Sequence, residues 1–281
     1  MFKLPDRTYP SKVLLFGEHL VLEGAMSLAI PINHFDSNWS EDLGKEDISE
    51  FLMFLASLNY LHKERLTFLE ESKYELKSNI PRGYGLGSSG NLCAALYEFL
   101  RPNLSNLNQS RIIRELAEME GYFHGKSSGL DAYVILKNRA VLVEDKTPVI
   151  IDLDLDTLPF SIFLLDSGIS RSSKSLIDHF LSVDKDDQSK SVLRKINDHI
   201  VHTMIAQDFS TFTKDLNKLS NLQWKSMQPF IVDSIKDIWE ASLSREDVNI
   251  KLCGAGGGGF YLAFGKSEAI ERLDAKMIRL N

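Results

Sequence analysis

The sequence predicts a protein that combines β-strands with α-helices and folds into about two domains. Its 281 residues are enough for two domains and a large buried core. Short apolar or alternating runs predict strands, and longer runs with apolar residues three and four positions apart predict helices. A boundary is expected near residues 156–159, which gives an N-terminal domain of residues 1–157 and a C-terminal domain of residues 158–281.

Strand-like segments occur in both predicted domains. They are residues 12–16, 27–32, 74–80, 132–136, 140–144, 149–151, 160–165, 248–253 and 260–264. Segments 132–136 and 140–144 are expected to form a hairpin, and segment 149–151 is expected to be a buried strand. Residues 36–47 are polar and acidic, and we expect them to form a loop.

Helical periodicity marks much of the remaining chain. The expected helices are residues 48–60, the run that follows residue 91, the run that begins at Ser110 and ends near Glu120, and residues 190–207, 209–222, 229–243 and 267–277. Ser110 is expected to cap its helix. Another helix is expected after the hydroxyl-rich turn at residues 170–173, and residues 63–70 fit no single pattern. Trp224 and Trp239 are expected in the core.

The composition is that of an ordinary globular protein. Hydrophobic residues make up 43% and charged residues 25% of the chain. With 39 acidic and 32 basic residues, the formal net charge is −7. This excess of negative charge argues against nucleic acid as a partner, because the phosphate backbone binds to basic surfaces.

Cysteine usage and the N-terminal residues indicate a cellular location. Cys93 and Cys253 lie in apolar surroundings without a CxxC partner, which predicts buried thiols in a reducing compartment. The first residues lack the apolar core of a signal peptide, and the longest apolar stretch, residues 51–58, is too short to span a bilayer. We therefore expect a cytoplasmic protein that has no membrane partner.

A glycine-rich stretch at residues 81–91 is the strongest single candidate for a ligand site. Its sequence, Pro-Arg-Gly-Tyr-Gly-Leu-Gly-Ser-Ser-Gly-Asn, lies between an expected strand and an expected helix. Glycines let a ligand approach the backbone, and the free N–H groups of a helix N-terminus attract anions such as phosphate. The stretch lacks the Gly-Lys-Ser/Thr ending of a Walker-type loop. Taken alone, it could equally be a turn that only caps the helix.

Four other turns carry residues that could take part in the same chemistry. Gly17-Glu18-His19 follows the first expected strand, and Asp166-Ser167-Gly168 follows the strand at residues 160–165. Asp131 ends a turn that begins at Lys126, and residues 254–259 contain five glycines between two strands. Each turn by itself could also be an ordinary surface turn with solvated charges.

Together these blocks resemble the pattern of the GHMP kinase superfamily, named for its galactokinase, homoserine kinase, mevalonate kinase and phosphomevalonate kinase members. The three blocks are Lys12 with residues 17–19, the loop at residues 85–89, and the glycine run at residues 254–258, in the order of the family. Residues 120–131 resemble the mevalonate kinase block, a glutamate followed by His-Gly-x-Pro-Ser-Gly-hydrophobic-Asp. A galactokinase would have arginine in place of the lysine, and homoserine kinases lack this lysine and aspartate pattern. The resemblance covers essentially the whole chain.

The resemblance implies an α+β fold of two domains. The N-terminal domain would be like the second domain of ribosomal protein S5, and the C-terminal domain would be ferredoxin-like. ATP, with Mg²⁺, and the substrate would meet in the cleft between them.

The resemblance also implies a role for individual residues. Asp131 would take the proton from the substrate hydroxyl, and Lys12 would favour ionised Asp131 and the developing alkoxide. Ser89 and Glu120 would bind Mg²⁺. The residues that would hold the ATP phosphates are Gly85, Leu86, Gly87, Ser88, Ser89 and Gly90. The residues that would hold or support the substrate are Glu18, His19, Asp166, Ser167, Gly254, Ala255 and Gly256.

The chain departs from the family pattern at several positions. Ser11 precedes the lysine where glycine is usual, and Ser127 replaces the proline of the block at residues 120–131. Gly90 and Asn91 stand where the family usually has two alanines. The segment between the first two blocks is short, so the part expected to cover adenine is reduced or rebuilt.

The function that the resemblance implies is phosphorylation of the primary hydroxyl of mevalonate by ATP, which gives 5-phosphomevalonate for isoprenoid synthesis. A kinase of a sugar or of phosphomevalonate is the alternative enzyme, and Lys126 and Arg171 would offer charge for a second phosphate. A non-catalytic relative that binds a small molecule is the alternative from a different class. The expected partner is a small hydroxy acid, and a homodimer is one oligomeric state that the sequence leaves open.

Overall fold

The chain forms two compact units, and each is described by itself. The computed structural model describes residues 2–41, 48–170, 180 and 188–281. The first unit contains Met1–Lys12, Pro31–Pro81 and Leu86–Arg139, and the second contains Val13–Ile30, Arg82–Gly85 and Ala140–Asn281. Because the units interleave along the chain, they do not test the domain boundary expected between residues 157 and 158, which stays a prediction.

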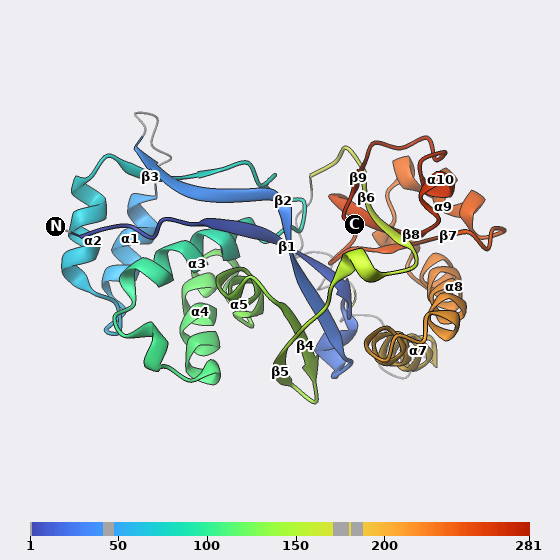
Figure 1. Cartoon of the computed structure of the whole chain (residues 1–281), viewed down its shortest axis with the longest axis horizontal. Coiled ribbons are helices and arrows are strands. Elements are labelled where there is room, and N and C mark those ends of the chain that lie inside the picture. The colour runs from blue at the N-terminus through green and yellow to red at the C-terminus, as the bar shows by residue number, and fades with distance from the viewer. Residues whose placement is uncertain (1, 42–47, 171–179, 181–187) are drawn as a thin grey trace. The chain divides into compact units, whose positions relative to one another are not determined.

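A sheet built on two long strands contributes to both units (Figure 1). Its strand order is β1-β2-β4-β5, and β3 pairs with the far part of β2. The strands are β1 (Thr8–Phe16), β2 (Ser27–Glu41), β3 (Tyr74–Ser78), β4 (Ala140–Glu144) and β5 (Thr147–Ile151). In the second unit, β2 pairs antiparallel with β4 from Ser27↔Val143 to Ala29↔Val141. β5 is an edge strand with Val149 46% exposed, so the prediction of a buried strand at residues 149–151 was wrong.

The strand β2 also extends into a segment that we expected to be a loop. Residues 37–41 pair antiparallel with residues 74–78 of β3, from Ser37↔Ser78 to Glu41↔Tyr74. The polar composition of this segment hid its alternation, in which Ser37 is buried and Trp39 half-buried while Asn38 faces solvent. The loop prediction was therefore wrong for residues 36–41, and residues 42–47 lie outside the described part.

Five helices lie in the described part of the first unit. They are α1 (Ser49–Ala56), α2 (Lys63–Glu71), α3 (Ser88–Leu100), α4 (Gln109–His124) and α5 (Leu130–Lys137). Helix α3 is its centre, because residues 93–97 are entirely buried and both α4 and α5 pack beside it (Figure 1). Helix α4 is capped by Asn108, whose side chain accepts a hydrogen bond from the Arg111 N–H, and not by Ser110 as predicted.

The helix α5 replaces a predicted strand. Residues 132–136 were expected to form a hairpin with residues 140–144, but only the second segment is a strand. Residues 132–136 are buried on every side, and such a short apolar run fits either a strand or a buried helix. The helix is delimited by Gly129 and Asn138, which adopt left-handed conformations with φ of 72° and 49°.

A four-stranded antiparallel sheet forms the core of the second unit. Its strand order is β7-β8-β6-β9, with β6 (Ser161–Asp166), β7 (Val248–Leu252), β8 (Phe260–Gly265) and β9 (Met277–Arg279). The helices among the described residues of this unit are α7 (Gln188–Ile205), α8 (Phe209–Ser226), α9 (Asp233–Ser242) and α10 (Ser267–Ile270). Helices α7 and α8 lie side by side, and α8 and α9 both contact β7 (Figure 1).

The C-terminal helix is shorter than the sequence predicted. Helix α10 ends at Ile270, and residues 277–279 form β9 along the free edge of β6. Residues near the predicted helix end therefore make main-chain bonds to a strand, from Phe163↔Arg279 to Leu165↔Met277. The helix expected at residues 229–243 likewise begins only at Asp233, because Pro229 lies in a short 3₁₀ turn.

Short 3₁₀ turns connect several of these elements, and the tryptophans and cysteines expected in the core lie there. Single 3₁₀ turns occupy Leu20–Glu23, Leu104–Asn106, Leu155–Thr157 and Gln228–Phe230. Trp239 is fully buried with Trp224 half-buried against it, and Cys93 and Cys253 are buried free thiols. None of the described helices combines the length and the apolar character that crossing a membrane requires. The helix expected after residues 170–173 lies outside the described residues.

Gly129 should be intolerant of substitution. A Cβ at this position would lie 2.2 Å from the main-chain oxygen of Ile113, and the φ of 72° disfavours any L side chain. We expect Gly129→Ala to lower the free energy of unfolding by at least about 2 kcal/mol. The control is Gly121→Ala in helix α4, where a Cβ meets nothing within 4 Å; it should be neutral or stabilising. Urea denaturation would measure both, and equal stabilities would contradict the packing described here.

Candidate active site

The glycine-rich loop forms a turn at the start of α3. Gly83, Gly85 and Gly87 have φ of 74°, 78° and 76°, a left-handed conformation that only glycine adopts readily. Gly87 is the N-cap of α3, and the first helical bond from this turn is donated by Asn91 N–H to the Gly87 oxygen. The preceding N–H groups of α3 therefore need acceptors from outside the helix, and free N–H groups at a helix N-terminus favour anions.

Lys12 and Asp131 meet beside this turn, in the first unit. Lys12 Nζ lies 2.8 Å from Asp131 Oδ2. The lysine side chain is 9% exposed and the aspartate side chain 43%, so the carboxylate is still open to a ligand. Lys12 N–H donates to the Leu86 oxygen, and the lysine side chain crosses Gly87, where a Cβ would lie 2.9 Å from Lys12 Cγ. Glycine at position 87 is therefore required by the path of the lysine.

Glu120 lies next to this ion pair and is nearly buried. It is 3% exposed and accepts a hydrogen bond of 2.6 Å from Ser127 Oγ. Burial, and secondly the negative charge of Asp131, raise the pKa of Glu120 to about 7. The bond from Ser127 and the charge of Lys12 oppose this rise. A Cβ on Gly90 would lie 2.8 Å from Glu120 Oε1 and 3.2 Å from Asp131 Cβ, so both acidic residues flank Gly90.

Ser89 and Asn91 of α3 make contacts that the sequence did not reveal. Ser89 Oγ lies 2.9 Å from Nε2 of His124, which is the last residue of α4. Asn91 is 1% exposed, and its Nδ2 donates to the main-chain oxygens of Tyr9 and Pro10 at 2.9 and 3.0 Å. Its side-chain oxygen accepts from Ser37 Oγ. Asn91, which stands where the family usually has alanine, thus joins α3 to β1 just before Lys12.

The first-unit residues offer a partial set of ligands for Mg²⁺. The candidate donors are the hydroxyl of Ser89 and the carboxylate of Glu120, with Asp131 nearby. In the part of the chain that the structure describes, no three or more His, Cys, Asp or Glu side chains form a group that could hold a metal ion. Mg²⁺ in kinases is commonly held by one or two protein oxygens, with phosphates and waters completing the octahedron. The donor set therefore fits Mg²⁺ bound together with a polyphosphate.

A second group of predicted residues comes together in the second unit. His19 Nε2 lies 2.9 Å from the main-chain oxygen of Ala255, and the imidazole packs against the rings of Phe180 and Phe230 at centroid distances of 4.9 and 4.8 Å. His19 has φ of 56°, an uncommon conformation for a residue other than glycine. At Gly256 a Cβ would lie 2.7 Å from the Phe230 oxygen, so this turn needs glycine to pack.

Glu18 forms a buried ion pair with a residue that sequence reasoning missed. Lys251, from the middle of the buried strand β7, bonds to Glu18 Oε1, and the two side chains are 0% and 1% exposed. Lys251 Nζ also donates to the Leu252 oxygen at 2.6 Å and lies 5.2 Å from the ring centre of Phe16. The available signal was a lysine in a predicted strand just before the glycine run.

The turn at residues 166–168 lies beside the glycine run of the second unit. Ser167 N–H donates to the Gly259 oxygen at 3.0 Å, which places the turn beside the end of the glycine run. Asp166 Oδ1 accepts from the Gly168 N–H, and Asp166 Oδ2 lies 3.3 Å from Lys276 Nζ. Asp166 thus has its own partners, whereas His19 contacts Ala255 of the glycine run and Glu18 pairs with Lys251.

The predicted site residues therefore form two groups, one in each unit. The first-unit cluster, as we call it, contains Lys12, Leu86, Gly87, Ser88, Ser89, Gly90, Glu120 and Asp131. Gly85 and all the residues expected to hold the substrate belong to the second unit. The roles expected for the individual residues stay predictions.

Comparison with known proteins identifies the class of this fold. Residues 53–139 match the family described as the GHMP kinases N terminal domain. A mevalonate kinase of Archaeoglobus fulgidus is 24% identical over 273 residues, which cover 92% of each chain. A mevalonate kinase of Aeropyrum pernix is 22% identical, over 94% of this chain and 89% of the relative.

Solved structures agree with this assignment. The mevalonate kinase of Methanococcus jannaschii has a TM-score of 0.67 and 17% identity, over 97% of this chain and 96% of the other. The mevalonate kinase of L. major in complex with R-mevalonate has a TM-score of 0.62 and 18% identity, over 96% and 90%. The phosphomevalonate kinase of Streptococcus pneumoniae in complex with phosphomevalonate and AMPPNP has a TM-score of 0.66 and 14% identity, over 97% and 99%.

The chain is therefore similar to the GHMP kinases, whose N-terminal domain family matches residues 53–139. Among these proteins it is similar to the mevalonate kinases, as the motif at residues 120–131 predicted. The predicted α+β class and GHMP kinase fold are confirmed.

Stability should depend on pH through Glu120. Its pKa of about 7 lies above the ordinary value of 4.5, so the folded state favours the protonated carboxyl. This stabilisation is present below pH 4.5 and is lost as the pH rises through about 7. In metal-free buffer at pH 8, we expect Glu120→Gln to raise the free energy of unfolding by about 3 kcal/mol, an advantage that disappears towards pH 4.5. Urea titrations at several pH values would measure it. Glu118→Gln, an exposed position on the same helix, should show no such trend; identical profiles for the two variants would contradict the prediction.

The pair between Glu18 and Lys251 should show strong coupling. Removing one partner leaves a charge buried without its counter-ion, so Lys251→Met should cost about 3–5 kcal/mol of unfolding free energy. The double variant Glu18→Gln, Lys251→Met removes both charges and should cost much less than the two single changes together. A double-mutant cycle by urea denaturation measures the coupling, and additive effects would show that the pair is not a unit.

Proposed function

We propose that this protein transfers the γ-phosphate of ATP to the primary hydroxyl of mevalonate and gives 5-phosphomevalonate. The observation that carries the proposal is the contact between Lys12 and Asp131 beside the glycine-rich N-terminus of α3. Phosphoryl transfer needs an anion cradle, positive charge and a correctly placed base more than covalent catalysis. The first-unit cluster has residues suited to each of these tasks, and the likeness to curated mevalonate kinases supports the substrate.

The phosphate loop and its neighbours would bind the nucleotide. The N–H groups of residues 85–90 would bind the ATP phosphates, and the positive end of the α3 dipole favours their charge. Ser89 and Glu120 would hold Mg²⁺, which neutralises phosphate charge when it is bound. His124 holds the Ser89 hydroxyl in this structure and would release it to a ligand.

Asp131 would act as the general base. Its carboxylate would accept the proton of the substrate hydroxyl as the oxygen attacks the γ-phosphorus. The ammonium group of Lys12, 2.8 Å from the Asp131 carboxylate, would stabilise negative charge on the attacking oxygen. The 43% exposure of the Asp131 side chain supports this role, because a base must reach the substrate.

The second-unit group would hold the rest of the substrate. His19 and the main-chain groups of residues 254–256 are candidates for direct contact, and Asp166 and Ser167 for support of the neighbouring turn. Glu18 is 1% exposed and paired with Lys251, so it would support His19 from behind instead of touching the substrate.

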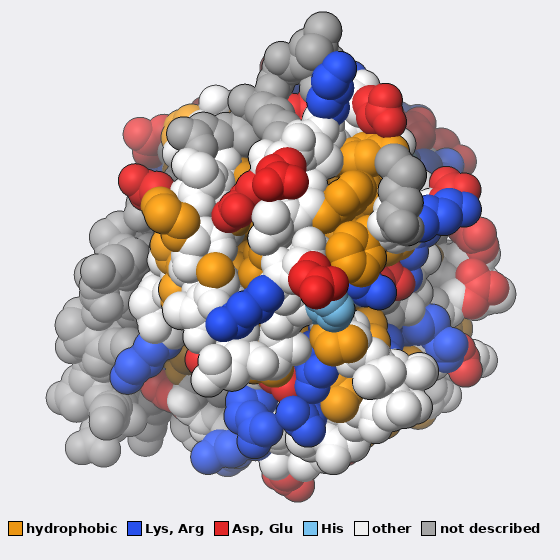
Figure 2. Space-filling model, turned by 90° about the vertical axis from the view of Figure 1, so that its left-hand side faces the viewer, with side chains coloured by type: hydrophobic (Ala, Val, Ile, Leu, Met, Phe, Trp, Pro, Cys, Tyr) orange, Lys and Arg blue, Asp and Glu red, His pale blue; other side chains and the backbone are white. Residues whose placement is uncertain are grey.

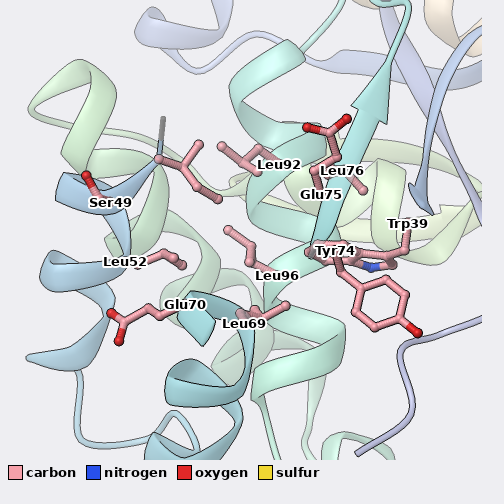
Figure 3. Close-up of a pocket in the computed structure, with 11 residues that line it drawn as sticks. Trp39, Ser49, Leu52, Leu69, Glu70, Tyr74, Glu75, Leu76, Leu92 and Leu96 are labelled. Carbon is pink, nitrogen blue, oxygen red and sulfur yellow. The ribbon is translucent and has the colours of Figure 1, made fainter. Parts of the chain in front are cut away.

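A pocket in the first unit offers room for the base of the nucleotide (Figure 3). Its volume is about 310 Å³, within the usual range of small-molecule pockets. Leu92 and Leu96 of α3 line one side, and residues of α1, α2, β2 and β3 line the others. Both leucines and glutamates line the pocket. Figure 2, which shows the side of the molecule that is on the left in Figure 1, has hydrophobic side chains gathered next to acidic ones. An apolar slot with acidic hydrogen-bond acceptors suits a purine that carries an amino group, and it lies in the segment that departs from the family pattern.

Phosphomevalonate and sugars remain alternative substrates. The structural likeness to the phosphomevalonate kinase of Streptococcus pneumoniae is comparable to that of the mevalonate kinases. Lys126, one of the two cations considered for a second phosphate, lies exposed between α4 and α5, and Arg171 lies outside the described residues. A non-catalytic role is disfavoured, because Lys12 and Asp131 are both present and in contact. The cytoplasmic location, a homodimer and the lack of a nucleic-acid partner stay predictions.

A coupled assay of ADP release would test the proposal. The purified protein would be supplied with ATP, Mg²⁺ and, in turn, mevalonate, phosphomevalonate and a panel of sugars. The proposal expects mevalonate to give the highest kcat/KM. Preference for another substrate would select an alternative kinase, and no stimulation by any of them would contradict the kinase assignment.

Asp131→Asn should abolish turnover without preventing nucleotide binding. Loss of a general base typically lowers the rate by about 10²–10⁴-fold, whereas the phosphate loop is unchanged. Steady-state kinetics would measure the loss, and calorimetry with ADP would measure nucleotide affinity. The control is Asp145→Asn in the exposed turn between β4 and β5, which should leave both unchanged. An active Asp131→Asn variant would show that another group is the base.

A further inference from the structure

Two departures from the family pattern contact the same side chain. Gly90 replaces a usual alanine, and Ser127 replaces a usual proline. The two residues are 37 positions apart in the sequence: Gly90 lies on α3, and Ser127 lies in the turn between α4 and α5. In the structure, one faces Oε1 of Glu120 and the other bonds to Oε2. The two departures are therefore connected through the candidate metal ligand.

Ser127 links Glu120 to the start of α5. Its hydroxyl donates to Glu120 Oε2 at 2.6 Å and accepts from the Gly129 N–H at 3.0 Å. Gly129 is the N-cap of α5, and Asp131 lies in the first turn of that helix. One hydroxyl thus fixes the candidate metal ligand relative to the helix that carries the candidate base. A proline has neither a donor nor an acceptor in its side chain and could make neither bond.

Gly90 provides the space for this position of the carboxylate. A Cβ at residue 90 would lie 2.8 Å from Glu120 Oε1, 3.0 Å from the Ala132 nitrogen and 3.2 Å from Asp131 Cβ. The distance to Oε1 is shorter than real Cβ contacts, and the other two are tight. An alanine would therefore force Glu120 out of its position or push α5 away from α3, and the carboxylate fills the volume that the missing methyl leaves.

We propose that Gly90 and Ser127 are a matched pair of positioning residues that hold the Glu120 carboxylate between α3 and α5 and thereby set its affinity for the divalent cation. The proposal rests on the function proposed above, in which Glu120 is a ligand of Mg²⁺. Gly90 allows the carboxylate to enter, and Ser127 fixes its orientation by a hydrogen bond. Both residues are needed. With Gly90 but without the Ser127 hydroxyl, the Glu120 carboxylate has room but is not held in place. With the Ser127 hydroxyl but without Gly90, the side chain at position 90 clashes with the carboxylate.

The pair predicts different results for variants at neighbouring positions. Ser127→Ala removes the hydrogen bond and Ser127→Thr keeps the hydroxyl. Ser128→Ala is the matched control, since Ser128 Oγ accepts from the Leu130 N–H at 3.3 Å in the same turn while Ser127 makes the bond to Glu120. Gly90→Ala introduces the clash. In the double variant Gly90→Ala, Ser127→Pro, the Glu120 carboxylate is free to move away from the new methyl group. The double variant should therefore lose less affinity for the cation than the single variants Gly90→Ala and Ser127→Pro combined.

Direct binding of Mn²⁺, as a stand-in for Mg²⁺, tests the proposal. Calorimetric titration of Mn²⁺ into the full chain saturated with a non-hydrolysable ATP analogue gives an affinity that does not depend on turnover. Ser127→Ala and Gly90→Ala are expected to weaken Mn²⁺ binding by about 10–100-fold, as is typical when a residue behind a metal ligand is lost. Ser127→Thr and Ser128→Ala should bind as the unaltered chain does. In kinetic assays, the first two variants should need more Mg²⁺ for half-maximal rate while the KM of the phosphate acceptor stays the same.

Several results would overturn the matched pair. Unchanged Mn²⁺ affinity in Ser127→Ala, an equal loss in Ser128→Ala, or strictly multiplicative effects in the double variant would each contradict it. Thermal unfolding of each variant separates lost binding from lost folding, and Gly90→Ala still tests the proposal if Ser127→Ala fails to fold. If the unaltered chain binds Mn²⁺ with the nucleotide but phosphorylates no substrate, the proposed function fails while the pair is still tested. If the chain is an active kinase and the variants bind Mn²⁺ normally, only the pair fails.

Discussion

An ion pair between β1 and the first turn of α5 is the contact on which the first-unit cluster depends. Lys12 Nζ lies 2.8 Å from Asp131 Oδ2, and the lysine reaches this position by crossing Gly87, where no Cβ would fit. A single side chain therefore fixes the relation between a strand, the glycine loop and a helix. Because Glu120 is buried close by, the lysine also offsets part of the repulsion between the two carboxylates.

A second lysine–carboxylate pair shows how burial changes the use of the same chemistry. Glu18 and Lys251 are 1% and 0% exposed, whereas the Asp131 side chain is 43% exposed. A carboxylate that is sealed in the core can hold a neighbouring turn but cannot accept a proton from a substrate. A carboxylate at the surface beside a buried lysine is open to a substrate. The difference between structural support and chemistry thus lies in exposure, not in residue type.

Much of the site could be predicted from sequence because glycines and short motifs mark it directly. The left-handed turns of the phosphate loop require glycine, so residues 83–87 were visible in the sequence. Contacts between distant segments were not visible. Lys251 became meaningful only when β7 placed it against Glu18, and Ser127 only when its bond to Glu120 was known. In the fold, α5 was mistaken for a strand because a short run buried on all sides has no period, and β9 was missed because its partner β6 lies more than one hundred residues earlier.

The buried amide of Asn91 has a mechanical consequence. It joins α3 to the main-chain oxygens of residues 9 and 10, two positions before Lys12, and also accepts from Ser37. Three chain segments are therefore cross-linked by one side chain that has no contact with solvent. These bonds hold the start of α3 against the part of β1 that directly precedes Lys12. The glycine turn and its lysine are thus joined twice, once by the Asn91 amide and once by the bond from the Lys12 N–H to the Leu86 oxygen.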